Sequence, residues 1–188
     1  MKKIPDNAKK VFEGVFFSVW QWEQQLYDGS FKTFEYVERP GGSTIIPVTK
    51  EGKIIIIEEE QPTEEKFFAF PGGSMEVGET PLECASRELL EETGYNAKSI
   101  KLWFSLPAED RVVSNFNIFI AQDCELTKQN YIDPGERIIV HLLTLDELLE
   151  KIEDKEFKCH AILPHLLKAK YKEEGKQKLK ELIGIMTS

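Results

Sequence analysis

The stretch from Gly72 to Tyr95, GGSMEVGETPLECASRELLEETGY, combines residue types that can support metal-assisted chemistry. It contains six glutamates and a single basic residue, Arg87, directly after two adjacent glycines. Like charges three or four residues apart on a helix repel each other by roughly 0.2–0.5 kcal/mol per pair. Oxygen ligands suit hard cations such as Mg²⁺ or Mn²⁺, and a bound cation would offset this repulsion. We therefore expect a metal site here, with a solvated acidic face as the ordinary alternative.

Local signals place the later glutamates of this stretch on one helix. Thr80 and Glu83 have the spacing of a capping box. Pro81 suits the first helical position, and Gly94 is typical of a helix C-terminus. These signals predict a helix over about 81–93.

A projection of that helix at about 100° per residue separates an acidic face from an apolar face. A sector of about 100° holds the carboxylates of Glu88, Glu91 and Glu92, and the thiol of Cys84 falls within it. The apolar stripe, which we expect to pack against a sheet, consists of Leu82, Ala85 and Leu89.

From Gly73 the sequence reads G-x5-E-x7-R-E-L-x-E-E-x-G-Y, which closely resembles the signature of Nudix hydrolases. The resemblance implies an α+β fold, an α/β/α sandwich on a mixed β-sheet. It also implies an enzyme that cleaves a nucleoside diphosphate linked to another group, by attack of water on phosphorus. The matching positions are Gly73, Glu79, Arg87, Glu88, Glu91, Glu92 and Gly94.

The same resemblance implies roles for these residues. Glu88, Glu91 and Glu92 would hold two or three Mg²⁺ or Mn²⁺ ions, aided by the Gly73 carbonyl. Such ions can bridge an acidic site and an anionic pyrophosphate, and they lower the pKa of a bound water. The Arg87–Glu79 pair would brace the loop on the helix, or it could be a plain surface ion pair.

The remainder of the chain resembles the branch that contains ADP-ribose and nucleoside-diphosphate-sugar pyrophosphatases. An N-terminal hairpin precedes the signature, and the segment PGERIIVHLLTLDELLE follows it. In that segment Glu136 matches an acidic residue that would act near the metal or as the general base. Asp133, Glu91 and Glu92 are further candidates for the base. The chain departs from the branch at Gln61-Pro62-Thr63, Ala69 and Pro71-Gly72-Gly73.

Several residues outside the signature are candidates for substrate binding. The aromatic side chains of Trp20 and Phe31 can stack on a nucleobase, although packing inside a hairpin or a dimer is the commoner role. Arg39 and Arg111 can meet phosphate or ribose oxygens, and Glu109 lies in a loop that can face the substrate. Isolated arginines are usually surface charges.

The pattern of apolar and turn residues predicts strands, one helix within the strand series, and helices at the end. Residues 1–10 are expected to fray, and Asp28-Gly29 lies between two strands of a hairpin. A boundary near residue 40 would divide an N-terminal hairpin segment, 1–40, from a hydrolase domain, 41–188. The final helix is expected to break near Pro164 or Gly175. The strands are expected at about 15–22, 31–37, 43–48, 53–57, 67–70, 100–106, 115–121 and 138–143, with a helix starting at 144.

The composition narrows the class of partner. A net charge of −9 and a pI of about 5.0 argue against broad binding to nucleic acid or to an anionic membrane. The three separated cysteines predict reduced thiols rather than disulfides or zinc. Without an apolar signal or membrane segment, we expect a cytoplasmic protein that dimerises through its hairpin.

These observations lead to one main hypothesis and two alternatives. The main hypothesis is metal-dependent hydrolysis of the pyrophosphate bond in a nucleoside diphosphate sugar such as ADP-ribose, giving a nucleoside monophosphate and a sugar phosphate. The first alternative is hydrolysis of nucleoside triphosphates or related phosphorylated metabolites. The second is a Nudix-like module that senses a nucleotide without hydrolysing it.

Overall fold

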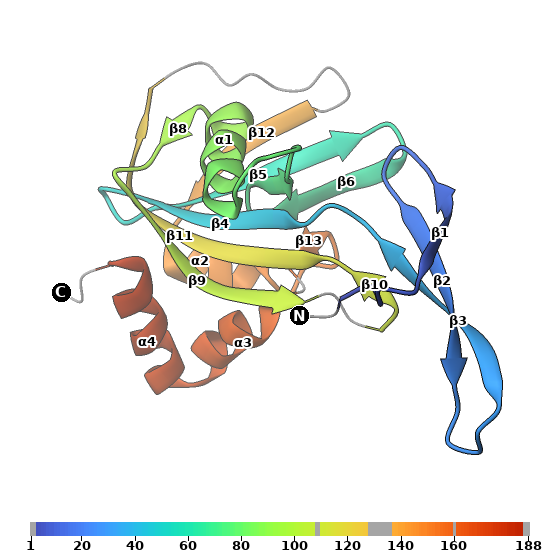
Figure 1. Ribbon diagram of the computed structural model, residues 1–188. Coiled ribbons are helices and arrows are strands. Elements are labelled where there is room, and N and C mark those ends of the chain that lie inside the picture. Colours follow the sequence, from blue (N-terminus) through green and yellow to red (C-terminus); the bar gives the residue numbers. More distant parts are fainter. Residues whose placement is uncertain (1–2, 108–109, 128–136, 160, 186–188) are drawn as a thin grey trace.

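The computed structural model describes residues 3–107, 110–127, 137–159 and 161–185. Within these ranges the chain forms two β-sheets and four α-helices, which confirms the predicted mixture of helices and strands (Figure 1). No helix in the described ranges is both long and apolar enough to cross a membrane.

The smaller sheet is built mainly from the N-terminal hairpin. Asp28 shapes the turn, because its Oδ1 accepts hydrogen bonds from the backbone N–H and the hydroxyl of Ser30, and Gly29 adopts φ 87°. The predicted hairpin is therefore present. The expectation that the first ten residues fray is wrong at its end, because Lys9 and Lys10 pair with β2. The strands of this sheet are β1 (Lys9–Glu13), β2 (Ser18–Gln25), β3 (Phe31–Glu38) and β10 (Val112–Val113).

The larger sheet is mixed. Strand β11 runs parallel to β4 and β13 runs parallel to β6, whereas the other pairs are antiparallel. Its order is β13-β6-β5-β4-β11-β8, with β12 on β5, β7 on β4 and β9 on β11. The strands are β4 (Gly42–Thr49), β5 (Ile54–Gln61), β6 (Glu64–Ala69), β7 (Gly72–Ser74), β8 (Tyr95–Asn96), β9 (Ser99–Pro107), β11 (Asn115–Leu126), β12 (Arg137–Leu143) and β13 (Phe157–Lys158).

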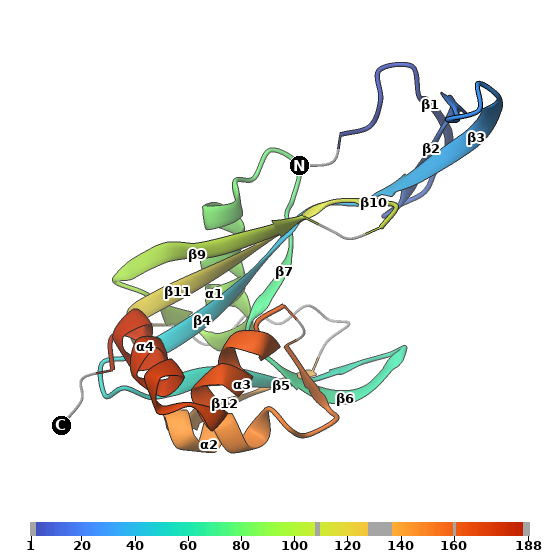
Figure 2. The same cartoon turned by 90° about the horizontal axis from the view of Figure 1, so that it is seen from below.

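Helices cover both faces of the larger sheet. Helix α1 packs on one face through a small apolar cluster that includes Ala85 and Leu89. The other three helices pack on the opposite face over a larger cluster, and Figure 2 shows them gathered together. The result is the predicted α/β/α sandwich. The helices are α1 (Pro81–Thr93), α2 (Leu145–Lys151), α3 (Leu163–Tyr171) and α4 (Glu173–Ile183).

The run Ile54–Ile57 is buried from both sides, as its unbroken apolar sequence predicts. All four side chains are at most 1% exposed. Ile54 and Ile56 belong to the cluster under α2, α3 and α4, whereas Ile55 belongs to the cluster under α1. Strand β5 therefore lies at the centre of the sandwich.

The C-terminal helices differ from the prediction in the position of the break. The break falls at Lys172, between α3 and α4, whereas Pro164 lies in the first turn of α3, where its missing N–H is tolerated. Gly175 lies inside α4. A glycine is needed there because a Cβ would lie 2.3 Å from the Lys168 carbonyl oxygen. The glycine therefore permits close packing of two helices rather than ending one.

Candidate active site

Helix α1 begins and ends where its sequence signals predict. The Thr80 hydroxyl accepts a hydrogen bond from the Glu83 backbone N–H, and the Glu83 carboxylate accepts one from the Thr80 backbone N–H at 2.8 Å. Gly94 closes the helix with φ 75°, and its N–H donates to the Leu90 carbonyl oxygen. The predicted capping box and C-terminal glycine are both confirmed, so the signature glutamates are fixed on a well-bounded helix.

One assignment on the faces of α1 is confirmed and one is wrong. Cys84 lies in the acidic sector, with its Sγ 3.8 Å from Arg87 Nη2, but it is fully buried because β7 runs beside the helix and the Gly73 carbonyl oxygen accepts from its thiol at 3.6 Å. Burial also raises the pKa of the Cys84 thiol. Leu82, expected to pack on the sheet, lies in the first turn and is 47% exposed.

The glycine pair before the helix forms part of a short strand, β7, rather than a simple loop. Gly73 pairs with Ser43 of β4 on one side. A Cβ at Gly72 would lie 2.3 Å from the Ser43 carbonyl oxygen, and φ at Gly72 is 155°. A Cβ at Gly73 would lie 2.2 Å from Glu88 Oε1. Gly72 requires glycine because the β4 backbone leaves no room for a Cβ, whereas a side chain at Gly73 would displace the Glu88 carboxylate.

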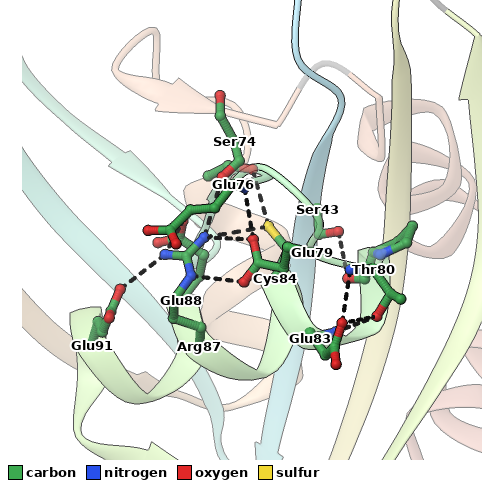
Figure 3. A network of polar contacts seen from close by, with 12 residues as sticks. Ser43, Ser74, Glu76, Glu79, Thr80, Glu83, Cys84, Arg87, Glu88 and Glu91 are labelled. Carbon is green, nitrogen blue, oxygen red and sulfur yellow. Dashed lines mark hydrogen bonds and ion pairs between the residues drawn. The ribbon is translucent and has the colours of Figure 1, made fainter.

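Arg87 links the loop to the helix through its whole guanidinium group (Figure 3). Its Nε and Nη2 donate to the two Glu79 carboxylate oxygens at 2.8 and 3.1 Å. Its Nη1 donates to Glu88 and to Glu91, each at 2.9 Å, and Nη2 also donates to the Ser74 carbonyl oxygen at 3.2 Å. The predicted Arg87–Glu79 pair is thus present, within a larger network that ties residues 74–79 to α1.

The network sets the charge of its members. Hydrogen bonds from Arg87 hold the pKa of Glu79 below its ordinary value. Burial raises the pKa of Glu88, although the guanidinium of Arg87 opposes that shift. Glu79 opposes any loss of the Arg87 proton, so the pKa of Arg87 rises above its ordinary value. Arg87 therefore stays charged, and a further cation near Glu88 would favour its ionised form.

A cavity of about 500 Å³ opens beside this network. Glu88 and Glu92 of α1 line it, together with the glycine pair of β7. The Glu92 side chain is held in place by the Gly72 backbone N–H, which donates to Oε2 at 2.9 Å, and the residue is 7% exposed. Across the sheet, β5 contributes Glu59 to the same cavity, and Glu59 is 6% exposed. Three carboxylates therefore border one open cavity.

The donor set fits a hard divalent cation that is shared with a substrate. The acidic side chains that line the cavity offer oxygen donors, which Mg²⁺ and Mn²⁺ prefer. Among the described residues, no three His, Cys, Asp or Glu side chains are close enough to form a complete protein cage. Mg²⁺ is usually held by one or two carboxylates with water and substrate phosphates, rather than by such a cage. Glu88 and Glu92 supply such a partial set.

Glu91, the third predicted metal ligand on the helix, points towards Arg87 and solvent instead of the cavity. Glu91 is bonded to Arg87, its side chain is 42% exposed, and it does not line the cavity in the described part of the chain. The Gly73 carbonyl oxygen, a further predicted ligand, accepts from Cys84. Glu136 and Glu109 lie outside the described residues, so the structure places neither.

The predicted substrate-binding residues of the N-terminal segment, and Arg111, lie outside the lining of this cavity within one chain. Trp20 donates from Nε1 to Glu38 at 2.9 Å, and Phe31 is 64% exposed on β3. The guanidinium of Arg39 lies between the Phe16 and Phe116 rings, about 5.0 and 5.1 Å from their centroids. That of Arg111 lies 5.7 Å from the ring centroid of Phe34. None of the four lines the cavity as the described residues form it.

Sequence reasoning missed three residues that the fold brings to the cavity, namely Glu59, Phe67 and Lys158. Only Glu59 had a usable signal, because the acidic run Glu58-Glu59-Glu60 directly follows the buried isoleucines of β5. Gln61 and Ala69, two positions at which the sequence departs from the pyrophosphatase branch, also line the cavity.

Comparisons with known proteins agree with this geometry. A family model described as the NUDIX domain matches residues 39–165. The chain is 32% identical over 165 residues to the ADP-ribose pyrophosphatase of Bacillus subtilis (strain 168), covering 83% of this chain and 88% of that protein. It is 30% identical over 153 residues to the methanol dehydrogenase activator of Bacillus methanolicus, covering 79% and 82%. The crystal structure of an ADP compounds hydrolase has the same fold, with a TM-score of 0.72 at 23% identity over 94% of this chain and 98% of that one. The chain belongs to the Nudix family of hydrolases.

Proposed function

We propose that the protein hydrolyses the pyrophosphate bond of a nucleoside diphosphate sugar such as ADP-ribose, releasing a nucleoside monophosphate and a sugar phosphate. The observation that carries the proposal is the open cavity bordered by Glu88 and Glu92 of the Nudix helix. Its volume of about 500 Å³ suits a small ligand. The names of relatives support the substrate class, since they include ADP-ribose pyrophosphatase and ADP compounds hydrolase.

Nudix hydrolases generally use divalent metal ions, and we propose two or three Mg²⁺ or Mn²⁺ ions per site. The ions would lower the pKa of a water and stabilise the charge that develops on the phosphate oxygens. Glu88 and Glu92 would hold them from the cavity wall. Glu91, the Gly73 carbonyl and Glu136 remain proposed as further ligands.

The protein itself contributes position and charge. The Gly72 N–H orients the Glu92 carboxylate, and Arg87 orients that of Glu88 while it ties Glu79 to the helix. Gly94 ends the helix that carries these groups. Glu91, Glu92, Asp133 and Glu136 are proposed as candidates for the base that takes the proton of the attacking water.

The N-terminal segment, 1–40, is proposed as a dimerisation element of the hydrolase domain, 41–188. Support comes from apolar side chains that the segment leaves in water, which a partner would cover. A second copy of the chain could bring Trp20, Phe31 and Arg39 of its segment, and also its Arg111, to the neighbouring site, where Glu109 is also proposed to bind substrate. The exposed side chains are Val11 (53%), Phe12 (57%), Val15 (110%), Phe16 (39%), Phe17 (46%), Tyr27 (113%) and Phe31 (64%).

This proposal predicts a homodimer in solution. Light scattering on the 21.7 kDa chain at micromolar concentration should give about twice the monomer mass. Phe12→Asp should shift the mass towards that of a monomer, because a buried charge at the interface is costly. Val77→Asp, a change at an exposed apolar residue outside the segment, should leave the mass unchanged. A wild-type chain that is monomeric under these conditions would contradict the proposed role of the segment.

A substrate panel tests the proposed function. With Mg²⁺ or Mn²⁺ present, ADP-ribose and nucleotide sugars should be hydrolysed faster than nucleoside triphosphates or dinucleoside polyphosphates, and the nucleoside monophosphate should be measured as product. EDTA should abolish turnover, because bare carboxylates repel the anionic substrate. Activity of the intact protein that is indifferent to EDTA would contradict the metal assignment.

Other outcomes of the panel select the alternatives. Preference for triphosphates would indicate an enzyme that hydrolyses nucleoside triphosphates, and binding without turnover would indicate a nucleotide sensor.

A cytoplasmic location is also proposed, supported by three cysteines that are all buried and unpaired. Burial raises the pKa of the Cys159 thiol to about 11 and that of Cys124 to about 12, so these thiols remain neutral.

A further inference from the structure

The cavity carries an unequal distribution of charge. Three carboxylates border it, those of Glu59, Glu88 and Glu92. Among the described residues that line it, Lys158 is the one basic residue. A nucleoside diphosphate is itself anionic, so it needs positive charge on each wall that its phosphates approach. Metal ions would supply this charge at α1, whereas the wall formed by β6 and β13 depends on Lys158.

Strand pairing aims Lys158 at the cavity. Glu59 of β5 lies opposite Phe67 of β6, and Ala69 of β6 lies beside Lys158 of β13. Phe67 and Ala69 share one face of β6 because side chains alternate along a strand, and paired residues on neighbouring strands share a face. The four side chains therefore form one wall, and all four line the cavity.

Two contacts hold the Lys158 ammonium group. Its Nζ lies 3.5 Å from the centroid of the Phe67 ring, and it forms an ion pair with Glu64. The Phe67 residue is 8% exposed, so the ring is a fixed platform. The Lys158 side chain is 42% exposed, so a ligand can reach the ammonium protons that face water.

We propose that Lys158 donates a hydrogen bond to a phosphate oxygen of the bound nucleoside diphosphate, from the wall opposite the carboxylates of α1. The inference rests on the proposed function and adds a binding residue to it. Lysine binds phosphate as a point charge, and three donors on a flexible stem tolerate small differences in substrate position. Phe67 positions the ammonium group, and Glu64 competes with the substrate for it.

The chain offers a matched control on the neighbouring strand position. Lys66 precedes Phe67 in β6, so its side chain points to the opposite face of the strand, where it pairs with Glu58. It does not line the cavity as the described residues form it. Lys66→Gln removes the same charge from the same strand region without touching the cavity wall.

The test compares binding and turnover in Lys158→Gln, Lys158→Arg and Lys66→Gln. Binding is measured by calorimetry with Mg²⁺ and α,β-methylene-ADP-ribose, which the enzyme cannot hydrolyse at its bridging carbon. Lys158→Gln should weaken binding and raise KM by about tenfold, the effect of losing a charge-assisted hydrogen bond, with kcat changed less. Lys158→Arg should keep most of the affinity, and Lys66→Gln should match the wild type.

A variant that is expected to bind more tightly distinguishes a direct effect on binding from a loss of folding. Glu64→Gln removes the anion that competes for the ammonium group, so it should bind the methylene analogue about two- to threefold more tightly, which unfolding cannot mimic. The inference is overturned if Lys158→Gln binds like the wild type, if Lys66→Gln weakens binding equally, or if Glu64→Gln binds more weakly. A wild type that hydrolyses no nucleoside diphosphate compound overturns the proposed function itself.

Discussion

Glu92→Gln should leave the fold intact and reduce hydrolysis by about a thousandfold, equivalent to roughly 4 kcal/mol of transition-state stabilisation. The glutamine oxygen can still accept from the Gly72 N–H, which now donates to Glu92 at 2.9 Å. The substitution removes the negative charge with which Glu92 is proposed to hold a metal ion. Steady-state hydrolysis of ADP-ribose and thermal unfolding, measured together, separate these two effects.

The same variant should lose a response to metal. Binding of an ion to the native state raises the unfolding temperature by mass action, so the wild type should unfold at a higher temperature when millimolar Mg²⁺ is added. Glu92→Gln should show little of this shift. Glu76→Gln provides the control, because Glu76 is exposed and lies in the loop before the helix. Full activity of Glu92→Gln would remove Glu92 from the mechanism.

Arg87→Met should lower the free energy of unfolding by about 2–3 kcal/mol, the largest stability effect expected at the site. The guanidinium contacts the carboxylates of Glu79, Glu88 and Glu91, and the Arg87 side chain is 24% exposed. Its removal leaves mutually repelling carboxylates in a partly buried network without a counter-charge. A fully buried pair costs about 3–5 kcal/mol when one partner is removed, and partial exposure reduces that figure. Urea unfolding followed by circular dichroism measures the difference.

The effect of Arg87→Met should depend on pH. Arg87 lowers the folded-state pKa of Glu79 below the ordinary value of 4.5. The stabilisation is therefore present above pH 4.5 and is lost as the pH falls through the lowered pKa. The gap between wild type and variant should be larger at pH 7 than near pH 3.5. Lys178→Met, which breaks an exposed ion pair with Glu174, should change stability little, and an equal loss in the two variants would contradict the special role of the Arg87 network.

Local sequence signals correctly predicted the features of the fold that depend on contacts between residues close together in the chain. The capping box at Thr80 and Glu83 and the left-handed Gly94 depend on contacts within a few residues, so their spacing alone defines them. The burial of Ile54–Ile57 was likewise readable, because an unbroken apolar run tolerates water on neither face. The hairpin around Asp28 and Gly29 belongs to the same class.

The surroundings of Cys84 and Gly175 depend on packing between separate elements, so the sequence did not predict them. The spacing of Cys84 on a helical wheel gives its angle but not its neighbour, and the neighbour is the returning strand β7. Gly175 suggests a helix break in the sequence, yet it lies within α4. The residue is a glycine because the Lys168 carbonyl oxygen lies too close for a side chain. In both cases the deciding contact comes from a separate element of secondary structure.

The sequence by itself determined the family, the acidic helix and the pair of glycines ahead of it, because these are encoded by short fixed spacings. Only the tertiary structure decided which charges share the cavity. Glu59, Glu92 and Lys158 lie on three different elements and meet because β5, β6 and β13 pair side by side opposite α1. Strand pairing over long sequence separations is set by the packing of the whole sandwich, and no local pattern in the chain records it.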